Sequence, residues 1–260
     1  MPFRTEMMDW TAEASPRLKA RIAGGLYLIV IIAGAFHYGF VRSVMVVSGD
    51  AAATAANILK NEILYRLGFV AAIILLCCNV PLALILYDLF KVVNRSLSAL
   101  VALFTLVATA IETANLLNFF APLILLSGRR YLSVFNAEQL QSLTYMLLEL
   151  QAIGFNVALV FFAFYDLSIG YLVLRSTFLP RILGLLMAIG GLCYLTNSFA
   201  NFLSPGFAAH LIPYIQLPSG VAELSLCLWL LVIGVNVPRW EKQASTAQQM
   251  PILHRLHSSD

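Results

Sequence analysis

The stretch LYRLGFVAAIILLCCNVPLALILYDLF, residues 64–90, decides the fold class of this chain. No charged residue lies between Arg66 and Asp88, and the stretch exceeds the roughly 20 apolar residues that a helix needs to cross a bilayer. The whole chain has the same character, with 60% hydrophobic and 11% charged residues, whereas a soluble domain carries roughly 25% charged residues. The sequence therefore predicts an integral membrane protein.

The same criterion predicts about six membrane-spanning helices in an all-α bundle. Besides residues 64–90, the spans are 22–41, 97–126, 142–174, 180–203 and 213–235. One transmembrane domain, 22–237, then lies between an N-terminal tail, 1–21, and a C-terminal tail, 238–260. The C-terminal tail is polar and shows little periodicity, so we expect it to be mobile.

Lysine and arginine are unevenly divided between the two sides of the predicted bundle. One side collects Arg4, Arg17, Lys19, Arg21, Lys91, Arg95, Arg175, Arg181, Arg239, Lys242 and Arg255; the other collects Arg42, Lys60, Arg66, Arg129 and Arg130. Because basic residues accumulate on the cytoplasmic side, both tails are expected there. Asp88 and Asp166 end two spans on that side and are expected to pair with nearby basic residues.

Between the first two spans, residues 51–61 predict an amphipathic helix on the outer surface, with Asp50 as its N-cap. Glu62 and Arg66 follow with the spacing and order of a helical ion pair. Their stripe is expected to face protein, so that the pair fixes this helix to the bundle. In the alternative interpretation, Arg66 binds an anionic group such as a lipid phosphate or a substrate carboxylate.

Three segments in combination carry a resemblance to a known family: RIAGGLYL (21–28), GDAAATAANILKNEILYRLGF (49–69) and FLPRILGLL (178–186). The chain resembles the bacterial multi-pass membrane family catalogued as domain of unknown function 4386, from the first span to the sixth. The resemblance implies a protein of the bacterial cytoplasmic membrane. It supplies no activity, cofactor or site residues.

Besides Asp88 and Asp166 near the span ends, three carboxylates, Glu112, Glu149 and Glu223, lie within the predicted spans, where an ionisable group is costly and suggests a function. Each belongs to a stripe of polar or small residues at helical spacing. The predicted ligand-binding residues are Glu112, Asn115 and Asn118 on the third span, Tyr145, Glu149 and Asn156 on the fourth, Asn197 and Asn201 on the fifth, Gln216 and Glu223 on the sixth, and Arg66. Most of them fall in the outer half, which predicts a cavity open to the outside.

Such a cavity leaves three classes of function open. The chain binds or transports a small polar, cationic or amphipathic ligand, held by carboxylates and amides. Alternatively it is a membrane-embedded metal enzyme, with His37 and His210 joining the glutamates at zinc. In the third class its polar core only fixes helix pairing. No nucleotide-binding motif or basic face for nucleic acid is present, and no motif specifies a cofactor or an oligomeric state.

Overall fold

The computed structural model describes residues 15–257, and within that range every regular element is helical. The elements are α2 (Pro16–Gly34), the π-helix η2 (Ala35–Val41), α3 (Arg42–Met45), α4 (Ala51–Lys60), α5 (Glu62–Phe90), α6 (Arg95–Leu125), the short 3₁₀ helix η3 (Arg130–Leu132), α7 (Ala137–Arg175), α8 (Arg181–Leu203), α9 (Pro205–Leu211), the 3₁₀ helix η4 (Tyr214–Gln216), α10 (Leu217–Leu228), the π-helix η5 (Trp229–Ile233) and α11 (Val237–His257). Arg4 lies outside the described residues.

Six continuous helices are long and apolar enough to cross a membrane, which confirms the predicted spans. They are Pro16–Met45, Glu62–Phe90, Arg95–Leu125, Ala137–Arg175, Arg181–Leu203 and Tyr214–Ile233. Polar caps extend several of them beyond the apolar limits read from the sequence. Asn136, for example, caps α7 by accepting from the backbone N–H of Gln139, whose side chain accepts in return from the N–H of Asn136.

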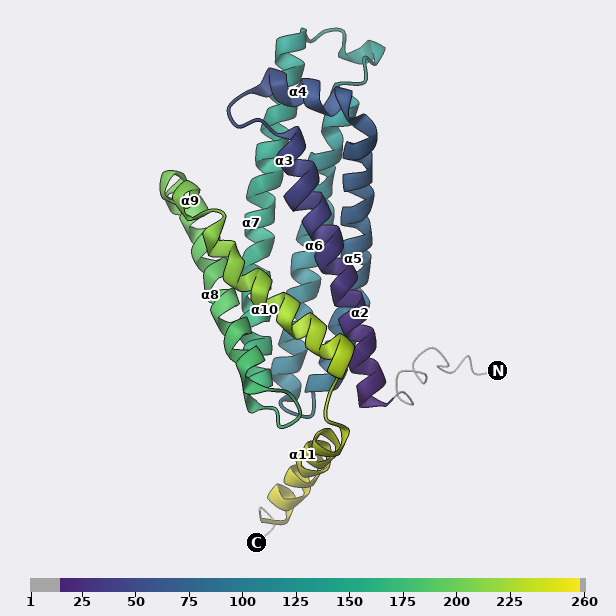
Figure 1. The fold of residues 1–260 in the computed structure, drawn as a ribbon, viewed down its shortest axis with the longest axis vertical. Helices are drawn as coiled ribbons and strands as arrows, with labels where there is room; N and C mark the ends of the chain where they lie inside the picture. The colour runs from purple at the N-terminus through teal and green to yellow at the C-terminus, as the bar shows by residue number, and fades with distance from the viewer. Residues whose placement is uncertain (1–14, 258–260) are drawn as a thin grey trace, which may run out of the picture.

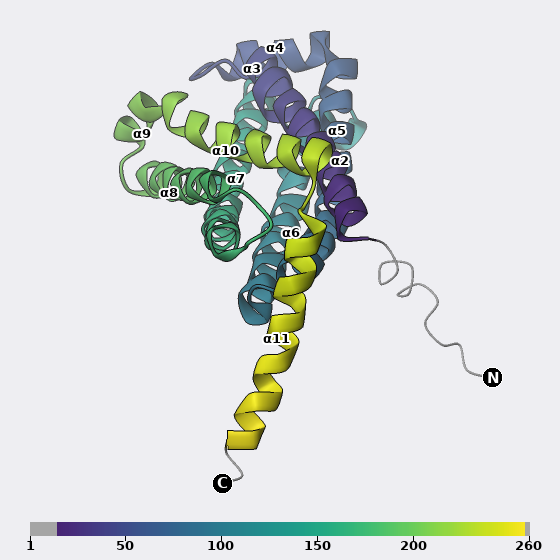
Figure 2. The same ribbon diagram turned by 60° about the horizontal axis from the view of Figure 1, so that its bottom comes forward.

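The six spans form a closed ring in which each packs on the next (Figures 1 and 2). Around the ring, α2 packs on α5, α5 on α6, α6 on α7, α7 on α8, and α8 on α10; α10 and η5 return to α2. The start of α2 and the helix α11 lie at one end of the bundle, and α4 lies at the other (Figure 1). The two ends of the described chain therefore share a side.

Two separate hydrophobic clusters fill the ring. The terminal core lies toward the end from which α11 leaves and includes Leu86, Phe90, Leu172 and Leu226. The α4 core lies beneath α4 and includes Met45, Ile58, Tyr65, Phe119 and Leu148. The space between the two clusters is where polar side chains enter the interior.

Helix α4 confirms the predicted helix between the first two spans. Asp50 caps it by accepting from the backbone N–H of Ala53 at 2.8 Å, and Ala55 and Ile58 are buried against the bundle. Arg66 does pair with Glu62, with its Nη2 2.7 Å from Oε1. Their side chains are 52% and 47% exposed, however, so the expectation that this pair faces protein was wrong.

The segment after residue 237 differs from the expected irregular tail, because it forms the helix α11. Polar contacts hold its first turns to the bundle: Trp240 donates from Nε1 to the carbonyl of Leu89 at 2.9 Å, and Gln243 accepts from the backbone N–H of Thr177 at 3.0 Å. Hydrogen bonds of this kind leave no apolar periodicity in a sequence, so the helix could not be predicted from hydropathy.

Candidate functional site

A pocket of about 370 Å³ lies inside the ring, and all six spans contribute side chains to it. Its wall is mainly aliphatic and aromatic, with a limited set of polar groups. The polar lining residues are Tyr27, Tyr38, Asn79, Thr105, Glu112, Tyr165, Tyr194, Gln216 and Glu223. Tyr27, Leu82 and Leu86 belong to the terminal core as well, and Leu76 to the α4 core, so the pocket fills the space between the two clusters.

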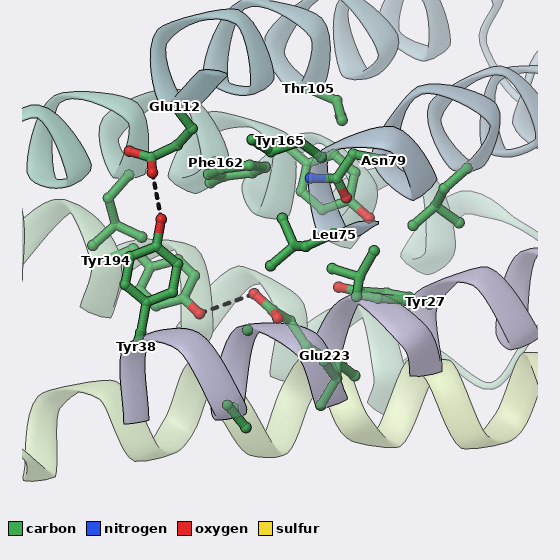
Figure 3. A pocket seen from close by; sticks show the side chains of 18 of the residues that line it. Tyr27, Tyr38, Leu75, Asn79, Thr105, Glu112, Phe162, Tyr165, Tyr194 and Glu223 are labelled. Carbon is green, nitrogen blue, oxygen red and sulfur yellow. Dashed lines mark hydrogen bonds between the residues drawn. The ribbon is translucent and has the colours of Figure 1, made fainter. Parts of the chain in front are cut away.

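Two glutamate–tyrosine pairs join different spans across this pocket (Figure 3). The hydroxyl of Tyr38 on η2 donates to Oε2 of Glu112 on α6, and Glu112 is only 3% exposed. The hydroxyl of Tyr194 on α8 donates to Oε1 of Glu223 on α10 at 3.0 Å. The four side chains thus come from four spans, and each carboxylate has a phenolic donor that fixes its orientation.

Local sequence explains how close these helices come to one another. Consecutive glycines let α8 fit between two neighbours: a Cβ on Gly190 would lie 3.0 Å from Cα of Ser219 on α10, and one on Gly191 would lie 2.8 Å from the carbonyl oxygen of Ala163 on α7. One turn later, Tyr194 meets Glu223. Tyr38 lies in the π-helical segment η2, and such widened turns are frequent at functional sites.

The charge of the lining is one-sided. Among the described residues that line the pocket, Glu112 and Glu223 are the two carboxylic acids, and none is a lysine, arginine or histidine. Arg42, four residues after Tyr38, donates instead to Oε1 of Gln151 on α7. Asn79 is 4% exposed and points into the pocket, and its side chain forms no hydrogen bond within residues 15–257.

Three of the residues predicted from sequence line this pocket: Glu112, Glu223 and Gln216. Glu149 does not, because its side chain is exposed on the outer face of α7. The buried face of α7 runs instead through Leu148 and Gln151, which lie one residue before and two residues after Glu149, so the predicted polar stripe is offset from the face that packs inside the bundle.

The predicted asparagines and Tyr145 lie outside the pocket lining, and they form hydrogen bonds with neighbouring groups instead. Asn115 donates to the carbonyl of Gln151 at 2.8 Å and to Glu112 at 3.4 Å, and Asn118 donates to Asn115 at 3.2 Å. Asn197 donates to the side-chain oxygen of Asn156 at 3.1 Å, and Asn201 donates to the carbonyl of Asn197 at 2.8 Å. The hydroxyl of Tyr145 accepts from the backbone N–H of Gly49 at 2.8 Å. These residues pair helices and order a loop.

The two candidate metal ligands do not meet. His37 is 1% exposed and its Nδ1 donates to the carbonyl of Gly68 at 3.0 Å. His210 is exposed, and its Nδ1 donates to Gly206 of the same short helix, α9. Within the described residues, no three histidine, cysteine, aspartate or glutamate side chains gather as metal ligands would. Arg66 remains with Glu62 on the surface.

Asp88 and Asp166, the two aspartates near the end of the bundle from which α11 leaves, differ in whether they have a partner. Asp88 pairs with both Lys19 and Lys91, as predicted. Asp166 does not follow that prediction: it is fully buried, and neither carboxylate oxygen has a hydrogen-bond partner among residues 15–257. It packs on α8, with its Cβ 3.1 Å from a Cβ built at Gly191. Its position near the end of a span that finishes with Arg175 had predicted an ion pair with a basic residue.

Sequence reasoning also missed the tyrosines that line the pocket. Tyr194 lies on the polar stripe of the fifth span with Asn197 and Asn201, but Tyr27, Tyr38 and Tyr165 belong to none of the predicted polar stripes. Tyrosines are common both in helix interfaces and at membrane boundaries. The available signal applies to Tyr194 alone, which lies near the middle of its span, Arg181–Leu203.

The comparison with known families places the chain. Residues 22–234 match the family described as Domain of unknown function (DUF4386), and the chain belongs to it. No curated protein and no solved structure matches. The match covers all the helices that line the pocket.

Proposed function

We propose that this protein binds or transports a small organic cation in the pocket between the two hydrophobic clusters. One observation carries the proposal: two carboxylates enter a mostly apolar pocket that has no basic lining residue. Carboxylates inside a membrane protein are costly unless they pair or serve a ligand. Within residues 15–257, the donors to Glu112 and Glu223 are the neutral side chains of Tyr38, Asn115 and Tyr194. A ligand cation would supply the positive charge that these carboxylates lack.

The rest of the lining fits a ligand with an apolar body. Small-molecule sites are predominantly apolar and have a few polar groups that fix orientation. Asn79 and Gln216 face the pocket with side-chain amides that form no hydrogen bond within the described chain, so they are available to a ligand. The proposed setting is the bacterial cytoplasmic membrane with both tails inside, supported by the distribution of lysine and arginine.

The test is saturable binding of radiolabelled octyltrimethylammonium to the protein in lipid nanodiscs, with empty nanodiscs as the blank. We expect binding of this cation and none of octyl sulfate, which has the same chain and the opposite charge. Glu112→Gln and Glu223→Gln should each weaken binding at least tenfold, about 1.4 kcal/mol. Glu149→Gln, at the exposed glutamate, is the matched control and should bind like the unmodified protein.

Absence of saturable binding above empty nanodiscs would overturn the proposal and leave helix pairing as the role of both carboxylates. Binding that all three glutamine variants retain would place the cation elsewhere on the protein. Equal binding of the cation and the sulfate would mean that the apolar wall, rather than the carboxylates, selects the ligand.

A further inference from the structure

The pocket is closed along the axis of the bundle. At one end Tyr27, Leu82, Leu86 and Tyr165 belong both to the pocket wall and to the terminal core. At the other end Leu76 joins the wall to the α4 core, which continues through Phe119 up to Ile58 on α4. A ligand that moves along the axis from either end would have to cross a packed cluster.

The side of the pocket between η2 and α10 is different. Three lining residues are exposed, namely Ala35 and Gly39 on η2 and Gly220 on α10, and all three are small. A Cβ built on Gly39 or on Gly220 meets no atom within 4 Å. These are the positions where the interior of the pocket comes nearest to the outer surface of the ring.

The path of α10 explains why the wall is thin between η2 and α10, a place called the gap below. At its far end α10 runs into η5, which packs tightly on α2: a Cβ on Gly24 would lie 2.4 Å from the backbone nitrogen of Leu231. From that contact α10 runs obliquely away toward α9, while η2 and α3 continue toward α4 (Figures 1 and 2). The two helices therefore diverge from a fixed crossing, and the pocket lies behind the divergence.

Both edges of this gap belong to membrane-spanning helices. Gly39 lies within the span Pro16–Met45, and Gly220 lies within Tyr214–Ile233. Apolar side chains such as Phe40 and Val221, which are 51% and 55% exposed, adjoin the small residues on the outer surface. The medium outside the gap is therefore the hydrocarbon of the bilayer, which excludes small hydrophilic ions but dissolves amphiphiles.

We infer that the pocket takes its ligand sideways from the bilayer, through a portal between η2 and α10 edged by Ala35, Gly39 and Gly220. The ligand class is then a membrane-dissolved amphiphile with a cationic head and a short apolar chain. Its head would meet Glu112 and Glu223, and its chain would extend toward the portal. This inference rests on the proposed cation binding for the ligand's charge, but the route itself stands on the geometry of the gap.

A first experiment tests the route without any ligand. Phe162 lines the pocket and is labelled in Figure 3, so Phe162→Trp, in a chain carrying Trp10→Phe, Trp229→Phe and Trp240→Phe, places a single tryptophan reporter there. In nanodiscs of brominated phospholipid we expect its fluorescence to be quenched, and the double variant Gly39→Phe/Gly220→Phe to relieve most of the quenching. Gly25→Phe is the matched control, since a Cβ there also meets nothing within 4 Å, and quenching should persist.

A second experiment measures entry. Association of octyltrimethylammonium with the Gly39→Phe/Gly220→Phe variant should be at least tenfold slower than with the unmodified protein, and with Gly25→Phe unchanged. An unchanged association rate, or a pocket reporter that brominated lipid does not quench, overturns the portal while leaving cation binding intact. Quenching relieved by the phenylalanines in a protein that binds no cation supports the portal and refutes the proposed ligand charge.

Discussion

The hydroxyls of Tyr38 and Tyr194 each reach from one span to a pocket carboxylate on another. Hydrogen bonds between membrane helices contribute on average about 0.6 kcal/mol, with a maximum of about 1.7 kcal/mol. These two bonds therefore contribute little to the stability of the protein. Their larger effect is to hold the two carboxylates in place.

Tyr194→Phe removes one of these donors and should lower the free energy of unfolding by about 1 kcal/mol. Unfolding in sodium dodecyl sulfate followed by circular dichroism measures the change. Tyr214→Phe is the control, because Tyr214 is 73% exposed and its hydroxyl forms no hydrogen bond within residues 15–257. A loss of equal size in both variants would contradict the role given to the Tyr194 hydroxyl.

Asp88 and Asp166 provide a second contrast between single residues. Asp88→Asn should destabilise the protein by up to about 1 kcal/mol, because it weakens partly exposed pairs with Lys19 and Lys91. Asp166 is buried, and its carboxylate oxygens have no hydrogen-bond partner in the described chain. Asp166→Asn keeps the shape of the side chain and removes the free-energy cost of burying an unpaired acidic group. Its stability should equal or exceed that of the unmodified protein in the same unfolding assay.

At the scale of the elements, glycines decide which helices touch. The crossing of α2 and η5 needs Gly24, and the crossing of α6 and α7 needs Gly154, where a Cβ would lie 2.4 Å from Oδ1 of Asn115. The arginines at the start of α2 add to the first crossing: Arg17 and Arg21 donate to the carbonyls of Ile233 and Val232, at 3.4 and 3.3 Å, at the end of η5.

Two adjacent glycines on α2 make a matched pair for testing this crossing. Gly24→Ala should destabilise the protein by about 1–3 kcal/mol, because the added methyl collides with the backbone of Leu231. Gly25→Ala has open space and should stabilise the helix by up to about 1 kcal/mol. The comparison of their unfolding midpoints checks the prediction, and a stable Gly24→Ala variant would show that the contact is looser than described.

For the whole molecule, the arrangement of six spans puts both described chain ends on one side, and the basic residues predict that this side is the cytoplasm. Cysteines placed at Lys60 on α4 and at Lys242 on α11 test this orientation in intact cells. We expect an impermeant thiol reagent to label Lys60→Cys and to label Lys242→Cys only after lysis. Labelling in the reverse pattern would invert the proposed orientation, and the unsubstituted chain controls for its own cysteines.

The sequence was sufficient for the six spans and for α4, because hydropathy over 20 residues and a capping aspartate are local properties. It was insufficient for the site, because the inward face of each helix depends on its neighbours. Glu112 and Glu149 lie on similar polar stripes, yet only Glu112 faces the pocket. The tyrosine partners were missed for the same reason: Tyr38 meets Glu112 only because their helices face each other across the pocket, which no periodicity in either segment encodes.

The length of α7 has a consequence for what lies beyond the bilayer. Its 39 residues, at 1.5 Å each, extend roughly 58 Å, nearly twice the thickness of the hydrocarbon layer. A protrusion capped by α4 must then stand clear of the lipid at one end. Limited proteolysis from that compartment should cut the protrusion at the 126–136 connection and leave the helices within the bilayer uncut.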